Sequence, residues 1–216
     1  MSFGQIYLSF SKKKIVNKYH YTNCTEQYLH MNFDSFSHGQ VESKIWLCET
    51  LEPLLPSQPH VYILGGWHNL LGFMLLSRQP RAYAHITSID CDPEAKTYAD
   101  KINDCWCYDP ETAIVTNITG DANTYEFNDS TAVYINCSPE HINNNLWFEH
   151  IPPGAMVCIQ SISITESGAP WHISNPNATM DEFLAKYPLD HYLFQDTKRI
   201  QYNHWGYDRY MIIGHK

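Results

Sequence analysis

A short apolar run that ends in two glycines is the feature of this sequence with the clearest chemistry. Val61 to Leu64 are apolar or aromatic, Gly65 and Gly66 follow, and another apolar run covers residues 70–76. This order predicts a buried strand, a tight turn and a helix. Glycines at such a turn let a ligand approach the backbone, because no Cβ stands in the way. The helix N-terminus beyond the turn offers N–H groups to an anionic ligand group.

Two later strand-like segments end in acidic residues. Asp90 and Cys91 close one apolar segment, and Asp121 and Ala122 follow a β-branched segment. Carboxylates there can accept hydrogen bonds from hydroxyl or amino groups of a ligand. The alternative is a purely local role in turns or helix capping, and capping suits Asp92 better than Asp90. Ligands of open α/β sheets bind at the carboxyl ends of the strands, so these ends are expected to form one site.

A fourth strand end carries an amide and two potential proton acceptors. Asn136 is placed to hold a ligand amine or the substrate, and Glu140 or His141 is placed to act as a general base. The alternative is a helix start, with Ser138 as the cap and Pro139 in the first helical position. The sequence leaves both readings open.

Alternating strands and helices must position these residues. Five apolar residues recur at intervals of three and four and predict an amphipathic helix before the first strand: Val41, Ile45, Cys48, Leu51 and Leu55. The pattern then predicts a parallel sheet with helices on both faces, closed by a long hairpin. The expected strands are 61–65, 84–90, 112–118, 131–136 and 155–161, the later helices 68–77, 94–103, 140–148 and 179–186, and the hairpin strands 190–196 and 207–213.

Composition narrows the functional class. A chain of 216 residues with 44% hydrophobic residues is most simply one domain with a proper core. The formal net charge of -9 argues against broad binding to nucleic acid, which relies on basic patches. We expect no membrane association and a cytoplasmic protein, since no apolar run is long enough to span a bilayer and the first residues do not form a signal peptide.

The seven cysteines and twelve histidines do not predict a metal site. The closest cysteine pair, Cys105 and Cys107, has one residue between, and the histidines form neither a His-Glu-x-x-His helix nor a tight triad. We therefore expect reduced thiols and no bound metal.

The order of these strand ends resembles the class I S-adenosylmethionine-dependent methyltransferases. Five strand–helix steps closed by a hairpin, with Gly65, Asp90 and Asp121 at successive strand ends, carry the resemblance over residues 41–216. It implies an α/β fold with a doubly wound, Rossmann-like seven-stranded sheet and a C-terminal antiparallel hairpin, in which the seventh strand lies between the fifth and sixth. It also implies S-adenosylmethionine as the cofactor.

The glycine turn departs from the pattern of that family. Gly65 takes the first position of the family's Gly-x-Gly-x-Gly turn, but Trp67 and Asn69 take the second and third. Ile63 stands where many members carry an acid, and Gly66 is an extra glycine. The resemblance still implies that Gly65, Gly66 and Trp67 border the cofactor.

The resemblance assigns the other strand ends residue by residue. Asp90 would bind the ribose hydroxyls, and Cys91 would line the adenine side. Asp121 would accept from the adenine amine, and the backbone N–H of Ala122 would serve a ring nitrogen. Asn136 would contact the cofactor or the methyl acceptor.

The acceptor is not specified by the sequence. Residues 1–40 are expected to form an N-terminal segment that either covers the site or packs as a leader, before a domain at 41–216. Acceptor contacts would come from this segment, the turn after Asn136 and a polar loop with Trp171 and His172. A small molecule is favoured over nucleic acid, because the Asp/Asn-Pro-Pro-aromatic motif of enzymes that methylate amino groups of nucleic acids is absent after the fourth strand.

Three other functions stay open at this stage. One is transfer of the aminocarboxypropyl group of S-adenosylmethionine, as in nicotianamine synthase-like enzymes, which would release methylthioadenosine. Another is nicotinamide-dependent oxidation, which the hairpin and Asp121 disfavour. The last is a non-catalytic binding protein of the same fold, which the altered glycine turn would suit.

Overall fold

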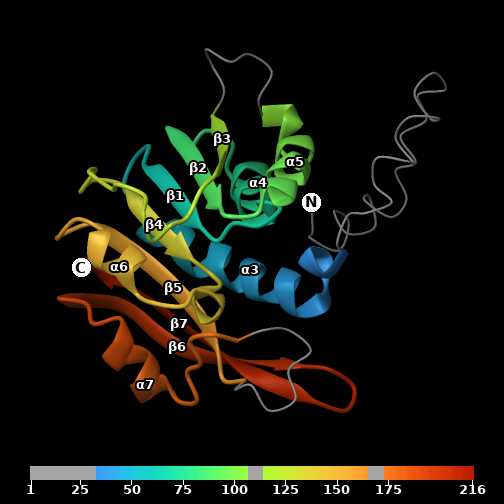
Figure 1. The fold of residues 1–216 in the computed structure, drawn as a ribbon, viewed down its shortest axis with the longest axis vertical. Coiled ribbons are helices and arrows are strands. Elements are labelled where there is room, and N and C mark those ends of the chain that lie inside the picture. The colour runs from blue at the N-terminus through green and yellow to red at the C-terminus, as the bar shows by residue number, and fades with distance from the viewer. Residues whose placement is uncertain (1–32, 107–113, 165–172) are drawn as a thin grey trace. The chain divides into compact units, whose positions relative to one another are not determined.

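A computed structural model describes residues 33–106, 114–164 and 173–216 of the chain (Figure 1). Most of the predicted N-terminal segment lies outside these ranges, as do Trp171 and His172. Helix α3 (His38–Leu51) crosses the expected domain start at residue 41.

The described strands form a seven-stranded sheet with the order β3-β2-β1-β4-β5-β7-β6. Strands β1 to β5 pair in parallel, and β7 runs antiparallel between β5 and β6. The predicted fold class and the place of the seventh strand are therefore confirmed. The strands are β1 (His60–Leu64), β2 (His85–Asp90), β3 (Val115–Thr119), β4 (Val133–Asn136), β5 (Met156–Ile162), β6 (His191–Gln201) and β7 (Gly206–His215).

The strand order dictates where the helices lie. Parallel strands are joined by right-handed crossovers, so helices change face where the strand order reverses, between β1 and β4. Helices α3, α4 (Leu70–Arg78) and α5 (Pro93–Ile102) pack beside one another. Helices α6 (Leu146–His150) and α7 (Met180–Lys186) share a separate core cluster with residues of β4 and β7.

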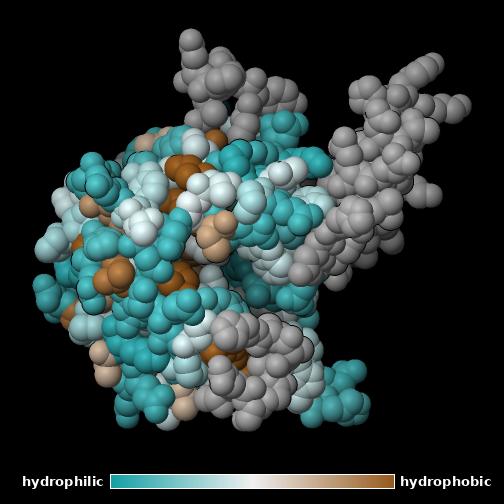
Figure 2. Space-filling view, viewed as in Figure 1, coloured by the Kyte–Doolittle hydropathy of each residue, from teal (hydrophilic) through white to brown (hydrophobic). Residues whose placement is uncertain are grey.

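Burial patterns explain why these segments form the sheet. Every residue of β5 and of β4 is buried, as expected for central strands covered on both faces. An aromatic group packs on the α6 and α7 side, where Trp147, Phe183 and Tyr187 are at most 1% exposed. The face seen in Figure 2 is largely hydrophilic, with apolar residues in small separate patches.

Helix α3 buries a different face from the one its apolar residues predict. Cys48 and Leu51 are buried as expected, but Val41 and Ile45 are only half-buried. Ser43 and Lys44 are buried in their place. The helix packs against both α4 and the β6–β7 hairpin, so its contact surface is wider than one apolar stripe.

The helix after β4 and the two hairpin strands differ most in length from the prediction. The helix predicted at 140–148 divides into a 3-10 turn, Pro139–His141, and the short α6, because consecutive asparagines favour turns over helix. In the hairpin, both strands extend further than predicted, and residues 202–205 make the turn. Lys198 and Arg199, expected in the loop, lie within β6 and pair with Glu42 and Asp208 at 2.7 and 3.1 Å.

Candidate functional site

The glycine turn after β1 has left-handed backbone at every second residue. Gly65, Trp67 and Asn69 have φ of 62°, 48° and 48°. Glycine adopts this conformation freely and asparagine tolerates it, whereas it is uncommon for tryptophan. These are the positions of the three family glycines, so the turn keeps a glycine-like backbone although two of the residues differ.

The two glycines are required by neighbouring strand ends. A Cβ on Gly66 would lie 2.0 Å from the Ser88 Oγ of β2, and one on Gly65 would lie 2.6 Å from the Ser138 Oγ beyond β4. The Ser138 hydroxyl donates to the Gly65 carbonyl at 3.1 Å. The N–H of Gly65 also donates to the Ile89 carbonyl at 2.9 Å. The turn is therefore wedged between the ends of β2 and β4, at the reversal of strand order.

Asn69 completes the turn as the N-cap of α4. It is fully buried, and its Oδ1 accepts the N–H of Gly72 at 3.1 Å. Its Nδ2 donates to Asn117 Oδ1 of β3 at 2.8 Å, and Asn117 in turn donates to Asp100 of α5 at 2.9 Å. This chain of buried amides ties the turn to β3 and α5. It also occupies one of the helix N–H groups that the sequence offered to an anionic ligand.

Asp90 lies against the glycine turn. Its Oδ2 accepts the N–H of Trp67 at 2.7 Å, and its Oδ1 accepts the N–H of Asp92 at 3.0 Å. Each carboxylate oxygen has two lone pairs, so both oxygens keep acceptor capacity for a ligand. Asp92 caps α5 by accepting the N–H of Glu94 at 2.8 Å, and Pro93 takes the first helical position, as predicted. Cys91 beside them is exposed.

The turn after β3 reaches the same edge. The N–H of Gly120 donates to the Asp90 carbonyl at 2.8 Å. Asp121 is exposed, and its Oδ1 accepts the N–H of Asn123 at 2.9 Å. Ala122 is buried in the core. Asp121 therefore stands next to the Asp90 strand end with a carboxylate on the surface.

Asn136 supplies a buried hydrogen-bond donor beside the glycine turn. It is fully buried and pairs in register with Leu64, the last residue of β1. Its Oδ1 accepts the N–H of Ser138 at 2.9 Å, but its Nδ2 has no hydrogen-bond partner among the described residues. A buried amide without a partner costs about 1–3 kcal/mol. A ligand bound at the glycine turn would complete the hydrogen bonding of this group.

The two candidate bases lie in different environments. Glu140 is 2% exposed and forms an ion pair with Arg209 of β7 at 3.5 Å. Its second oxygen accepts from the Ser161 hydroxyl at 3.4 Å. His141 is exposed. The geometry favours a structural role for Glu140, because its carboxylate is already fixed between β5 and β7.

A further buried cation, Lys44, lies near this ion pair. Arg209 also donates to the Cys137 carbonyl, and its Nε is a buried donor with no partner among the described residues. Lys44 of α3 is 9% exposed, and burial lowers its pKa to about 8. Burial raises the pKa of the Cys137 thiol, which Lys44 and Arg209 partly oppose. Lys44 and Arg209 could not be recognised from the sequence, since neither stands in a recognisable motif.

Within the described part of the chain, the His, Cys, Asp and Glu side chains form no group of three or more that could hold a metal ion. Its helices also include none with the length and apolar character needed to cross a bilayer.

Comparison with solved structures relates this arrangement to known proteins. The N-methyltransferase NodS from Bradyrhizobium japonicum WM9 superposes with a TM-score of 0.59 over 83% of this chain and 98% of its own, at 10% sequence identity. YcgJ from Bacillus subtilis gives a TM-score of 0.60 over 81% of this chain and 98% of its own, at 12% identity. The fold is that of the class I methyltransferases. TehB from Haemophilus influenzae has a TM-score of 0.55 at 13% identity, over 79% of this chain and 61% of TehB.

Sequence comparison adds nothing to this relationship. No protein-family model and no curated protein sequence matches the chain. The similarity therefore rests on strand order and strand-end geometry, and the residues of the candidate site must be judged by their own chemistry.

Proposed function

We propose that this protein is an S-adenosylmethionine-dependent methyltransferase whose cofactor lies across the carboxyl ends of β1, β2, β3 and β4. The observation that carries the proposal is the unpartnered Nδ2 of Asn136, buried beside the glycine turn where the strand order reverses. Open α/β sheets bind ligands at this reversal. Support also comes from NodS, of which a structure in complex with S-adenosyl-L-homocysteine superposes at a TM-score of 0.59 and 10% identity.

The polar groups at this edge fit the chemistry of the cofactor. Asp90 presents acceptors to a ribose, and Asp121 presents an acceptor to the adenine amine, with the N–H of Ala122 next to it in the chain. Because Asn136 Oδ1 is bonded to the N–H of Ser138, its remaining group is a donor. It therefore suits a carboxylate or another oxygen better than the ammonium group of the methionine end.

The protein's own contribution is alignment and exclusion of water. When bound, S-adenosylmethionine supplies a methyl group already activated by a sulfonium. The site must hold a nucleophile in line with it and exclude water, and both requirements are met by positioning rather than by a dedicated acid or base. This agrees with a Glu140 that is fixed in an ion pair, since methyl transfer does not require it as a base.

A small-molecule acceptor suits the charge distribution better than nucleic acid. The net charge is -9, and four basic side chains on the described surface pair with acids, among them Arg78 with Glu52 and Lys96 with Asp100. Counterion release by unpaired basic groups drives most nucleic-acid binding.

The strand order supports S-adenosylmethionine over a nicotinamide dinucleotide as the cofactor, because the dinucleotide fold lacks an antiparallel strand between the fifth and sixth.

Calorimetric titration of the purified protein with S-adenosylmethionine, S-adenosylhomocysteine and NADH tests the proposal. We expect the first two to bind and NADH not to bind. Asp90→Asn should weaken S-adenosylhomocysteine binding by about 2 kcal/mol, or roughly 30-fold, from lost charge-assisted hydrogen bonds. Asp190→Asn, an exposed acid at the opposite edge of the sheet, is the matched control. Binding of NADH alone would contradict the proposal, and methylthioadenosine as a reaction product would replace methyl transfer with aminocarboxypropyl transfer.

A further inference from the structure

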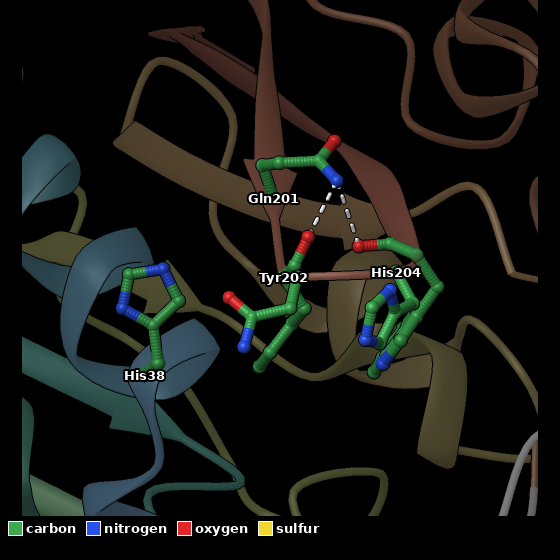
Figure 3. Close-up of a pocket in the computed structure, with 6 residues that line it drawn as sticks. His38, Gln201, Tyr202 and His204 are labelled. Atoms are coloured by element: carbon green, nitrogen blue, oxygen red, sulfur yellow. Dashed lines mark hydrogen bonds between the residues drawn. The ribbon is translucent and has the colours of Figure 1, made fainter.

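A cavity of about 470 Å³ lies at the turn of the β6–β7 hairpin, where it meets the start of α3 (Figure 3). We call it the hairpin cavity. This size is within the range of small-molecule sites. The residues that line it are His38, Gln201, Tyr202, Asn203, His204 and Trp205.

An aromatic platform forms one side of the cavity. The rings of Tyr202 and Trp205 stack with centroids 4.5 Å apart and planes within 3°. The His38 and Tyr202 rings meet edge to face, with centroids 5.4 Å apart. Stacked and edge-on arrangements of this kind are the favoured geometries of aromatic pairs. The platform is therefore formed by contacts within the protein itself.

Hydrogen bonds hold the platform in place. The backbone N–H of Tyr202 donates to the Trp205 carbonyl at 2.8 Å, and the Gln201 amide donates to the carbonyls of Tyr202 and Trp205 at 2.6 and 3.1 Å (Figure 3). The Tyr202 hydroxyl accepts the N–H of Gly39 at 3.0 Å. These bonds join the hairpin turn to α3, so the cavity walls come from two elements fixed to each other.

Trp205 remains exposed in spite of this order. Its exposed fraction is 48%, although the Tyr207 ring also stacks against it with centroids 5.9 Å apart. Tyr207 is 8% exposed and belongs to a small core with Ile162 and Ile200. A large ring is thus held rigidly at the surface without contributing its full area to the core. Rigid, half-exposed aromatic rings are typical of recognition surfaces.

The lining restricts the chemistry of a ligand. None of the six lining residues is Lys, Arg, Asp or Glu. The nearby charges of the hairpin are paired, Lys198 with Glu42 and Arg199 with Asp208. The lining offers aromatic faces together with imidazole and amide groups, which can donate to or accept from the edge of a ring. An uncharged heteroaromatic ring fits this combination better than a phosphate or an ammonium group.

The cavity lies on the same edge of the sheet as the glycine turn. Arg209, near the start of β7, pairs in register with Ile162 at the carboxyl end of β5. The segment leading into α3 also contacts the glycine turn after β1, since Ser35 Oγ and His68 Nδ1 are 2.9 Å apart. A molecule bound at the hairpin would therefore approach the carboxyl ends of the strands.

We propose that the hairpin cavity binds an uncharged heteroaromatic ring of nucleobase size, carried by a free small molecule. We further assign this ring to the methyl acceptor, and this second step rests on the proposed function. Stacking of the ligand ring on Trp205 supplies most of the binding free energy. The Asn203 amide and the His38 and His204 imidazoles form hydrogen bonds with the edge of the ligand ring.

The test is tryptophan fluorescence titration with guanosine, cytidine and uridine; adenosine is left out because it would compete for the proposed cofactor site. We expect saturable binding of at least one nucleoside. Trp205→Ala should weaken it by about 5- to 150-fold, the usual effect of removing a stacking ring, and Trp205→Phe should keep most of it. Leu193→Ala removes another exposed apolar side chain of the same hairpin, 40% exposed, and should have no effect. Saturation-transfer NMR of the ligands checks that the Trp205→Ala result reflects binding rather than a lost signal.

Separate results decide the two steps. If no nucleoside binds to protein that binds S-adenosylhomocysteine, the ring site is wrong and the proposed function stands. If a nucleoside binds equally well to Trp205→Ala, the ring site is also wrong. Nucleoside binding without S-adenosylhomocysteine binding would keep the ring site and remove the acceptor role. Salt-dependent binding of a short single-stranded RNA, much tighter than any nucleoside, would overturn the choice of a free small molecule.

Discussion

Replacement of Glu140 by glutamine separates a structural role of this residue from a catalytic one. Glu140 and Arg209 are both at most 3% exposed, and Lys44 contributes a further positive charge nearby. Loss of the carboxylate charge leaves two cations without a counter-charge in the interior. Removing one partner of a buried ion pair costs about 3–5 kcal/mol.

At neutral pH, the loss of unfolding free energy in Glu140→Gln is expected near the lower limit of this range. The pKa of Lys44 is already lowered to about 8, so this residue can lose its proton at modest cost and relieve part of the repulsion. We therefore expect Glu140→Gln to lower the unfolding free energy by about 3 kcal/mol, which corresponds to roughly 6–12 °C in Tm for a domain of this size. The loss should be larger at pH 6 than at pH 9, where Lys44 is mostly neutral.

Urea denaturation at these pH values measures the effect. His141→Gln changes an exposed side chain of the same turn and is the control. Simultaneous replacement of Arg209 by methionine should recover part of the stability, because the cation left unpaired is then removed. The structural role is refuted if the unfolding free energy of Glu140→Gln lies within about 0.5 kcal/mol of wild type while methyl transfer is abolished. A difference of that size is typical of surface substitutions. That result would make Glu140 a catalytic base.

Further predictions concern burial and close packing. Lys44 has a lower pKa in the folded than in the unfolded chain, so the unfolded state binds more protons between about pH 8 and 10.5. The unfolding free energy should therefore rise by about 3 kcal/mol as the pH rises through that range. Lys44→Met should abolish this rise in pH-dependent urea denaturation, and exposed Lys96→Met should not. Gly66→Ala should lower the unfolding free energy by about 1–3 kcal/mol through its clash with Ser88 Oγ, and Ser88→Gly should restore part of it; equal stability of the single and double variants would exclude this contact.

The alternation of apolar runs with helical segments was sufficient to predict the order of the elements. It was sufficient because each parallel strand needs a crossover, and strand ends then meet at one edge. Asp90 and Asp121 could be placed at that edge for the same reason. The turn at Trp67 and Asn69 could not be predicted, because its left-handed backbone is stabilised by a distant carboxylate, Asp90, and by Asn117.

The charged interior was beyond the reach of sequence patterns. Arg209 meets Glu140 only because β7 inserts antiparallel beside β5 with a particular register. Lys44 is buried because α3 packs against both α4 and the β6–β7 hairpin. The spacing of the apolar residues in this helix indicated only one buried face. The hairpin turn was predicted too long for a similar reason, since Lys198 and Arg199 have loop-like polarity but are paired with acids across neighbouring elements.

A crystal structure of the protein with S-adenosylhomocysteine is the most direct test of the cofactor site. Our account predicts the ribose hydroxyls on the Asp90 carboxylate, the adenine beside Asp121 and Ala122, and an oxygen of the ligand within hydrogen-bond distance of Asn136 Nδ2, the donor that lacks a partner among the described residues. A ligand bound elsewhere, or bound at this edge with Asp90 and Asn136 both out of contact, would contradict it.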